Sequence, residues 1–189
     1  MKKWLFTASL VLLTACSAPQ PPQLNFAPQA FLSTNPIADG KSFTLTSKDV
    51  RTAQYVALVD SGRANVIPLH AQQNLRITLE NQLAKQLASQ GFHTSMTSNN
   101  SVTMVLQDAL VNVKHSVMEN EMDALVVLAV TAETPKGKLV KTYTGTAKRT
   151  GVLSASDQDI EMVLNDVTNL VLADIAADKE LQNYMRERF

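Results

Sequence analysis

Hydrophobic and polar residues alternate in the first folded part of the chain in a way that predicts strands. Residues 42–47 place Phe and Leu between serines and threonines, which is typical of a strand with one buried face. Two apolar runs follow, residues 55–60 and 64–69, joined by Asp60-Ser61-Gly62-Arg63. Because Gly tolerates a positive φ and Asp and Ser bond nearby amides, this joint predicts a hairpin turn.

Two longer stretches carry the spacing of amphipathic helices. Leucines recur every four positions through residues 71–90, and Gly91 supplies a stop at the C-terminal end. Residues 154–177 form the second stretch, in which Ser156 and Asp159 have the spacing of a capping box. A short amphipathic segment, Lys179–Arg188, follows it.

The stretch between these helices is predicted to be a β-meander. Its apolar residues occupy even positions up to residue 106 and odd positions from residue 111. Such a phase shift would turn one face inside out, so we predict a bulge within residues 107–110. Residues 124–130 are all apolar, which predicts a central strand covered on both faces. Residues 138–148 carry lysines and threonines on one face, as expected of a protected edge strand.

These elements predict an α+β domain. We expect a mainly antiparallel sheet, made of the hairpin plus the meander, with two long helices packed on one face. One such domain over residues 41–189 accounts for the whole folded part of the chain.

The N-terminal residues follow a different pattern. Lys2 and Lys3 precede an apolar segment that ends at Leu13-Thr14-Ala15-Cys16. A charged start, an apolar middle and a small-residue cleavage site are the parts of a bacterial export signal. The apolar run, about a dozen residues, is shorter than the ~20 residues of a membrane-spanning helix. Residues 1–15 are therefore predicted to be a lipoprotein signal peptide that is cut before Cys16; the alternative is an ordinary secretory signal in which the cysteine is incidental.

The four residues Leu13, Thr14, Ala15 and Cys16 resemble the lipobox of bacterial lipoproteins. The resemblance implies a diacylglycerol on the Cys16 thiol and an acyl chain such as palmitate on its amino group, with no other cofactor. Two or three acyl chains hold a protein on a membrane essentially permanently. Ser17 follows Cys16 where the enterobacterial sorting rule has Asp for inner-membrane retention. By resemblance, this favours the inner leaflet of the outer membrane, facing the periplasm.

The predicted mature chain is slightly acidic. Loss of Lys2 and Lys3 takes Lys and Arg from 17 to 15 against 17 Asp and Glu, so the net charge becomes −2. This argues against a sequence-independent nucleic-acid binder, which needs a strong basic excess. Cys16 is the only cysteine, so no disulfide forms within the chain. Residues 16–40 are predicted to be the lipidated cysteine, a Pro-rich tether and a lead-in to the domain.

Several of these features together resemble the YajG-type lipoproteins. They are the lipobox, the Pro-rich tether, Asp49-x-Arg51-Thr52 before a strand, the leucine helix that ends at Gly91-Phe92, and the meander and helix that run into Asp178. The resemblance covers nearly the whole mature chain. It implies a small envelope lipoprotein and carries over no catalytic residues.

Other chemistry in the chain is sparse. His70, His93 and His115 lack the close partners of metal ligands, so we predict no metal site. Asp60 and Ser61 could join one histidine in a catalytic triad, but no Gly-x-Ser-x-Gly elbow accompanies them, and a turn explains them better.

Paired carboxylates and a group of basic residues complete the candidates. Glu119 with Glu121, and Asp157 with Asp159, could serve acid–base chemistry, although Asp at a helix start usually complements the helix dipole. The candidate interaction strip consists of Lys136, Lys138, Lys141, Lys148 and Arg149. It could bind an anionic polymer, lipid headgroups or an acidic partner, or simply guard an edge strand.

We therefore expect a lipid-anchored, non-enzymatic accessory or binding module for an envelope protein complex or the cell wall. The alternative is an envelope hydrolase that acts on peptidoglycan or lipid. The expected partners are the membrane, through the lipid anchor, and an envelope protein or peptidoglycan, with no nucleic acid.

Overall fold

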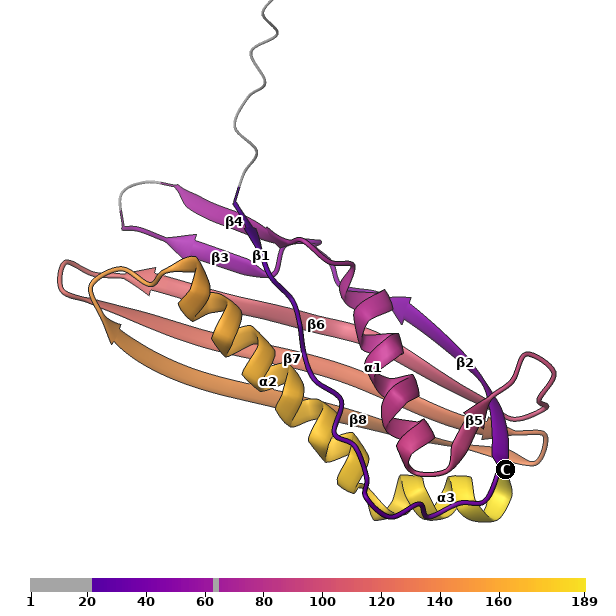
Figure 1. Ribbon diagram of the computed structural model, residues 1–189. Helices are drawn as coiled ribbons and strands as arrows, with labels where there is room; N and C mark the ends of the chain where they lie inside the picture. The colour runs from indigo at the N-terminus through magenta and orange to yellow at the C-terminus, as the bar shows by residue number, and fades with distance from the viewer. Residues whose placement is uncertain (1–21, 63–64) are drawn as a thin grey trace, which may run out of the picture.

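The computed structural model describes residues 22–62 and 65–189, which form one curled sheet with helices lying across it (Figure 1). The strands are β1 (Gln23–Leu24), β2 (Lys41–Asp49), β3 (Ala57–Asp60), β4 (Val66–Ala71), β5 (Phe92–Thr94), β6 (Ser101–His115), β7 (Glu119–Thr134) and β8 (Gly137–Val152). The helices are α1 (Leu75–Ser89), α2 (Asp157–Ala177) and α3 (Lys179–Arg188).

The sheet is assembled around β6. One edge of β6 pairs antiparallel with β7, which in turn pairs antiparallel with β8. The other edge holds two strands end to end, because β2 lies parallel to residues 101–106 and β3 lies parallel to residues 111–114. β4 and then β1 extend the sheet beyond β3, and β5 extends it beyond β2.

The predicted fold, a mainly antiparallel sheet with two long helices on one face, is wrong. Within the described residues, four of the seven strand pairings are parallel, so the sheet is mixed. Three helices, of 15, 21 and 10 residues, accompany it there. Alternation along a strand shows which face is buried, but it does not show which strand lies beside it. Parallel partners are joined by long crossovers, and those that pair β2 or β3 with β5 or β6 run through α1. A local pattern does not reveal such crossovers.

Several local predictions are confirmed. β3 and β4 form the antiparallel hairpin, and the Asp60 carboxylate accepts a hydrogen bond from the Gly62 N–H at 2.8 Å in its turn. Gly62 has a φ of 69°, which favours glycine. The β6–β7 register shifts between Leu106 and Asp108, within the predicted bulge range.

The helices begin at side-chain caps. α1 starts at Leu75, later than predicted, because Ala71 still belongs to β4 and Asn74 caps the helix. The capping box of α2 is confirmed, since the Ser156 hydroxyl accepts from the Asp159 N–H and the Asp159 carboxylate accepts from the Ser156 N–H. None of the helices in the described residues is long and apolar enough to cross a membrane.

α2 packs closely on the sheet because one strand position lacks a side chain. A Cβ on Gly145 of β8 would lie 2.6 Å from the Val171 Cγ2 of α2 and 3.0 Å from Val167 Cγ1. Glycine therefore lets the helix approach the strand, and the buried aliphatic face of α2 covers the middle of the sheet.

Residues 22–40, here called the strap, belong to the fold. Leu24 and Phe26 are buried in the core. Alternate N–H groups of the strap donate to polar side chains on α2: Asn25 to Glu161 Oε1 (2.7 Å), Ala27 to Asn165 Oδ1 (2.9 Å) and Gln29 to Asn169 Oδ1 (2.7 Å). Two extended residues advance about 6.7 Å and four helical residues about 6.0 Å, so the two spacings match. The segment predicted as a lead-in thus runs along α2 as part of the domain.

The two faces of the sheet differ in their cover. Inward-facing Val126, Leu128 and Val130 of β7 are buried, whereas Leu125 and Val127 on the other face are half-buried. The prediction that residues 124–130 are covered on both faces is therefore wrong. β8 pairs only with β7 among the described strands, so the predicted edge strand is confirmed.

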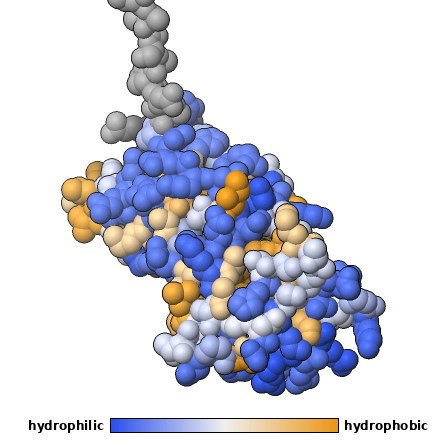
Figure 2. Space-filling view, turned by 45° about the vertical axis from the view of Figure 1, so that its right-hand side comes forward, coloured by the Kyte–Doolittle hydropathy of each residue, from blue (hydrophilic) through white to orange (hydrophobic). Residues whose placement is uncertain are grey.

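The uncovered side of the sheet is called the outer face from here on. Its centre consists of alternate apolar residues on paired strands: the half-buried Val105, Leu110, Leu125 and Val127, and the buried Ala129. Thr142, Thr144 and Thr146 of β8 lie beside them, paired with Ala129, Val127 and Leu125. Figure 2 shows mostly polar side chains at the surface, with one group of hydrophobic side chains at the left end and smaller groups over the middle.

Candidate functional site

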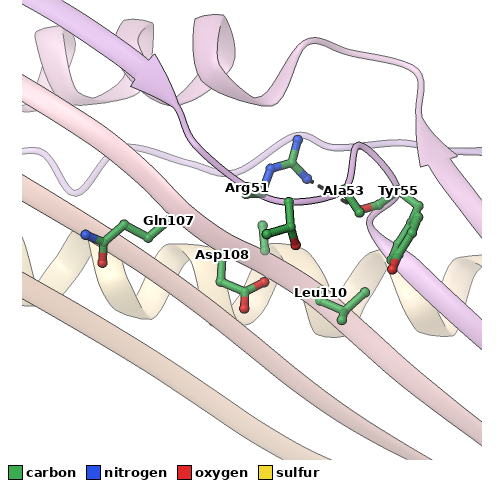
Figure 3. Close-up of a pocket in the computed structure, with 8 residues that line it drawn as sticks. Arg51, Ala53, Tyr55, Gln107, Asp108 and Leu110 are labelled. Carbon is green, nitrogen blue, oxygen red and sulfur yellow. Dashed lines mark hydrogen bonds between the residues drawn. The ribbon is translucent and has the colours of Figure 1, made fainter.

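A cavity of about 200 Å³ opens where β2 ends and β3 begins along the edge of β6. Its lining comes from the loop before β3 and from the bulge of β6: Arg51, Thr52, Ala53, Tyr55, Gln107, Asp108, Ala109 and Leu110 (Figure 3). The pairings of β2 and β3 stop short of residues 107–110. The cavity is thus a result of two strands sharing one edge.

Arg51 and Asp49 form the most enclosed ion pair at this cavity. Arg51 Nη2 lies 2.9 Å from Asp49 Oδ2, and Arg51 Nε lies 3.1 Å from Asp49 Oδ1, with 5% and 18% of the two side chains exposed. The guanidinium also donates to the Tyr55 carbonyl at 3.4 Å. Burial of Asp49 opposes its ionisation, but the hydrogen bonds and charge of Arg51 outweigh burial and lower the Asp49 pKa.

This ion pair stabilises the loop between β2 and β3. Asp49 Oδ1 also accepts a hydrogen bond from the Arg51 backbone N–H at 3.1 Å. The Asp49 carboxylate thus binds both the side chain and the backbone of Arg51. Arg51 and Asp49 also line a second cavity of about 160 Å³, with His70 and Gln73 in its wall. Because the charges of Asp49 and Arg51 satisfy each other, we assign these residues a structural role.

The candidate interaction strip is divided between the two faces of β8. Lys141 lies on the helix side, where its Nζ is 2.7 Å from Glu180 Oε2 and 3.2 Å from Asp178 Oδ2. These hydrogen bonds raise the Lys141 pKa. Arg149 also lies on this side, with Nη2 2.6 Å from Asp166 Oδ2. Both cations therefore join β8 to the helices.

The other three basic residues form no ion pair with a helix residue in the described part of the chain. Lys148 forms an ion pair with Glu121 of the neighbouring strand β7, and this contact raises the Lys148 pKa. Lys136 and Lys138 form no ion pair with any other residue in the described ranges. Lys138 and Lys148 share the outward parity of the threonines on β8, so they border the outer face.

The histidines lie on three different elements: His70 on β4, His93 on β5 and His115 at the end of β6. Within residues 22–62 and 65–189, no group of three His, Cys, Asp or Glu side chains could hold a metal ion. His115 Nε2 accepts a hydrogen bond from the Ala155 N–H at 3.2 Å. His115 thus ties the loop before α2 to the sheet.

The remaining candidate side chains have local partners. Asp60 stabilises the hairpin turn beside Ser61, as its contact with Gly62 shows. Glu121 pairs with Lys148, while Asp159 belongs to the capping box, where the hydrogen bonds from Ser156 lower its pKa. Each of these contacts stabilises a turn, a strand pair or a helix start.

The lipid-anchor prediction concerns residues that the structure does not describe. Leu13, Thr14, Ala15 and Cys16 lie outside the described residues, as do residues 17–21 of the predicted tether. The described chain begins at Pro22, directly before β1.

Residues 28–186 match a family model described as an uncharacterized lipoprotein. The chain belongs to this lipoprotein family. The match extends from the strap into α3, so it covers most of the fold described above. Membership places the protein in the cell envelope and confirms the resemblance stated from the sequence.

Known proteins support this assignment along the whole chain. The uncharacterized lipoprotein YajG of Escherichia coli strain K12 is 23% identical over 189 residues, which cover 98% of this chain and 97% of that protein. The YajG protein of strain O6:H1 gives the same values. A crystal structure from Xanthomonas campestris aligns with a TM-score of 0.52 and 11% identity, covering 84% of this chain and 96% of that one. At this identity the likeness shows a shared fold alone.

The sequence reading missed the polar row on α2 that holds the strap. Asn165 and Asn169 belong to this row and accept hydrogen bonds from the strap. Together with Glu161 they recur every four residues, and such spacing places side chains on one face of a helix. A polar row beside an apolar one was the signal that an extended segment could bind there.

Proposed function

We propose that this envelope lipoprotein is a non-enzymatic accessory module whose outer face binds a protein of an envelope complex. A lipid on Cys16 would hold the domain on the inner leaflet of the outer membrane, facing the periplasm. The lipobox and Ser17 support this address. The outer face of the sheet supports the binding role.

The observation that carries the proposal is the apolar centre of the outer face. β7 is apolar on both sides, a pattern typical of strands that are covered on both sides. Within the described residues, α2 and α3 pack on the inner side of β7, and Leu125 and Val127 remain half-buried on the outer side. A protein surface packed on the outer face would complete the burial that this strand pattern predicts.

The composition of the outer face suits a protein partner. Aliphatic side chains form its centre, threonines of β8 flank that centre, and Lys138 and Lys148 lie at its border. Protein interfaces commonly combine an apolar centre with a polar rim. An anionic cell-wall polymer would be attracted by free basic groups, and Lys141, Lys148 and Arg149 already have acidic partners. These features favour a protein over the cell wall.

Site-specific cross-linking in intact cells tests the proposal. Thr144→Cys places a thiol on the exposed outer face, and Lys85→Cys places one on the exposed side of α1 as a matched control. Cys16 is the only native cysteine and is blocked when it carries lipid, so a thiol-reactive photo-cross-linker would report the introduced site. Adducts are identified by mass spectrometry.

We expect a discrete protein adduct with T144C that is weak or missing with K85C and is lost when Cys16→Ala removes the anchor. Equal labelling at both thiols would contradict an interface on the outer face. If T144C gives no protein adduct and the protein fractionates with isolated cell wall, the cell-wall alternative replaces this proposal.

A further inference from the structure

Four apolar side chains stand exposed at one end of the sheet, and we call them the apolar tip. They are Val117 (95% exposed), Met118 (75%), Val152 (82%) and Leu153 (64%). The first two form the turn between β6 and β7, and the last two lie at the end of β8. The Leu153 N–H donates to the Met118 carbonyl at 3.0 Å, which joins the two pairs into one surface. Contiguous apolar side chains exposed in this way usually mark a contact surface.

The tip is held in shape by buried groups beneath it. Leu153 has a φ of 64°, which is unfavourable for a residue with a bulky side chain. The buried Asn120 donates from Nδ2 to the Leu153 carbonyl at 2.9 Å. Gly151 makes room for this contact, because a Cβ there would lie 2.8 Å from Asn120 Nδ2. The surrounding structure therefore fixes Leu153 in an otherwise unfavourable conformation.

The N-terminus of the described chain heads toward the same end of the sheet. β3 ends near the tip, because its last residue, Asp60, pairs with Lys114 close to the end of β6. β4 starts beside this end of β3, where Val66 pairs with Asp60. β4 then runs away from the tip, and β1 runs parallel to it. Followed backwards from Leu24 to Gln23, the chain consequently points toward the apolar tip.

The length of chain before β1 matches the distance to the tip. Gln23 of β1 pairs with His70 of β4. The residue before His70, Leu69, pairs with Ala57 of β3, and Ala57 pairs with Val111 of β6. Across these strands His70 therefore lies level with Leu110 of β6. Seven strand positions from Leu110 to Val117 span about 23 Å. The seven residues from Cys16 to Pro22 reach at most about 25 Å when extended. A lipid on Cys16 can therefore lie in the plane of the tip.

We propose that the apolar tip contacts the phospholipid leaflet in which the lipid on Cys16 is embedded. This inference rests on the lipid anchor of the proposed function. The anchor and the tip would then form two points of attachment and orient the sheet with its tip end toward the lipid. α3 and the C-terminus, which lie at the far end of the sheet in Figure 1, would point into the periplasm. The outer face would stand upright and accessible to a partner from the side.

Tryptophan fluorescence in brominated vesicles tests this contact. The only native tryptophan is Trp4, inside the predicted signal peptide, so the processed chain contains none. Val117→Trp reports on the tip, and Met96→Trp, at a position 98% exposed before β6, reports on the opposite end of that strand as a matched control. Each processed lipoprotein is purified from cells and reconstituted into phosphatidylcholine vesicles with plain or brominated acyl chains.

Apolar side chains of interfacial segments enter a bilayer by about 5–10 Å, so we expect roughly two-fold quenching of V117W and none of M96W. Absence of V117W quenching in protein that co-floats with the vesicles would overturn the proposal. A blue shift of V117W that depends on protein concentration without vesicles would assign the tip to a second copy of the chain. If the processed protein does not co-float with the vesicles at all, it carries no lipid anchor. That result would contradict the proposed function on which this inference rests.

Discussion

Alternate residues of β7 lie in two different environments. Val126, Leu128 and Val130 are buried beneath the helices, whereas Leu125 and Val127 of the same strand are half-buried on the outer face. The two sets are similarly hydrophobic, so their difference in burial comes from what packs on each face. The inner face therefore contributes most to stability, and the outer face keeps apolar surface that we assign to partner binding.

The largest expected loss of folding stability comes from truncating a side chain on the inner face of β7. Leu128→Ala removes three buried carbon atoms and leaves a cavity, which typically costs about 2–5 kcal/mol. Urea denaturation measures the loss. Leu125→Ala, the same change on the outer face, is the matched control and should cost clearly less, because half-buried Leu125 loses less packing. Equal losses at the two positions would show that the outer face is also part of the core.

A pair of identical substitutions at neighbouring positions sharpens the comparison. Val126→Thr would bury a hydroxyl among apolar side chains, so we expect a loss of about 1–3 kcal/mol. Val127→Thr places the same hydroxyl on the outer face, where water reaches it, and the change should stay within about 0.5 kcal/mol. Thermal and urea unfolding of both variants check the difference. A larger loss for V127T than for V126T would reverse our assignment of the faces.

A third prediction concerns Asp178, which closes one end of the inner face. Its carboxylate accepts from the Tyr143 hydroxyl at 2.9 Å and from the N–H groups that start α3, and it lies 3.2 Å from Lys141. Burial opposes ionisation of Asp178, but these hydrogen bonds and the charge of Lys141 outweigh burial and lower its pKa. Asp178→Asn should cost about 1–2 kcal/mol at pH 7, where the carboxylate is charged.

The pH dependence of D178N provides the control. Because the Asp178 pKa is lower in the folded chain than its ordinary value of 3.8, its contribution is complete above that value. The contribution is lost as the pH falls through the lowered pKa of the folded state. Wild type should therefore lose stability more steeply than D178N over this acid range. Parallel curves for the two proteins would contradict the role of Asp178.

The smallest expected loss of stability comes from weakening the contact between the strap and α2. Asn165→Ala removes an acceptor for the Ala27 N–H and a donor to the Asn25 carbonyl. Both strap groups can turn to water, so we expect a loss of about 0.5–1.5 kcal/mol. Hydrogen exchange should become faster at the Ala27 amide. Asn165→Asp keeps the acceptor, and it should protect this amide better than alanine does; equal exchange in both variants would argue against the contact.

The strongest sequence predictions were those that depend on neighbouring residues. The hairpin turn at Gly62, the Ser156–Asp159 capping box and the bulge after Leu106 all appear where the sequence indicates. Each results from a few adjacent residues, because glycine permits a positive φ, side-chain oxygens accept from a helix start, and a shifted alternation needs an extra residue.

The candidate interaction strip was drawn from proximity in sequence rather than from the direction of the side chains. Successive residues of a strand point to opposite faces, so Lys141 and Arg149 have one parity and Lys138 and Lys148 the other. The division between the faces was therefore readable from the sequence. The ion pairs with Asp166, Asp178 and Glu180 were not, because they join β8 to helices far along the chain.

The sequence by itself determined the envelope lipoprotein class, the resemblance to YajG-type proteins, the local turns and caps, and which positions of each strand are apolar. Only the tertiary structure decided that β2 and β3 share one edge of β6, that the strap lies along α2, and that one apolar face of β7 remains uncovered. Local patterns depend on backbone preferences and on alternation, which act over a few residues. Pairing and cover depend on contacts between distant segments, and the burial that these contacts achieve is a property of the whole chain.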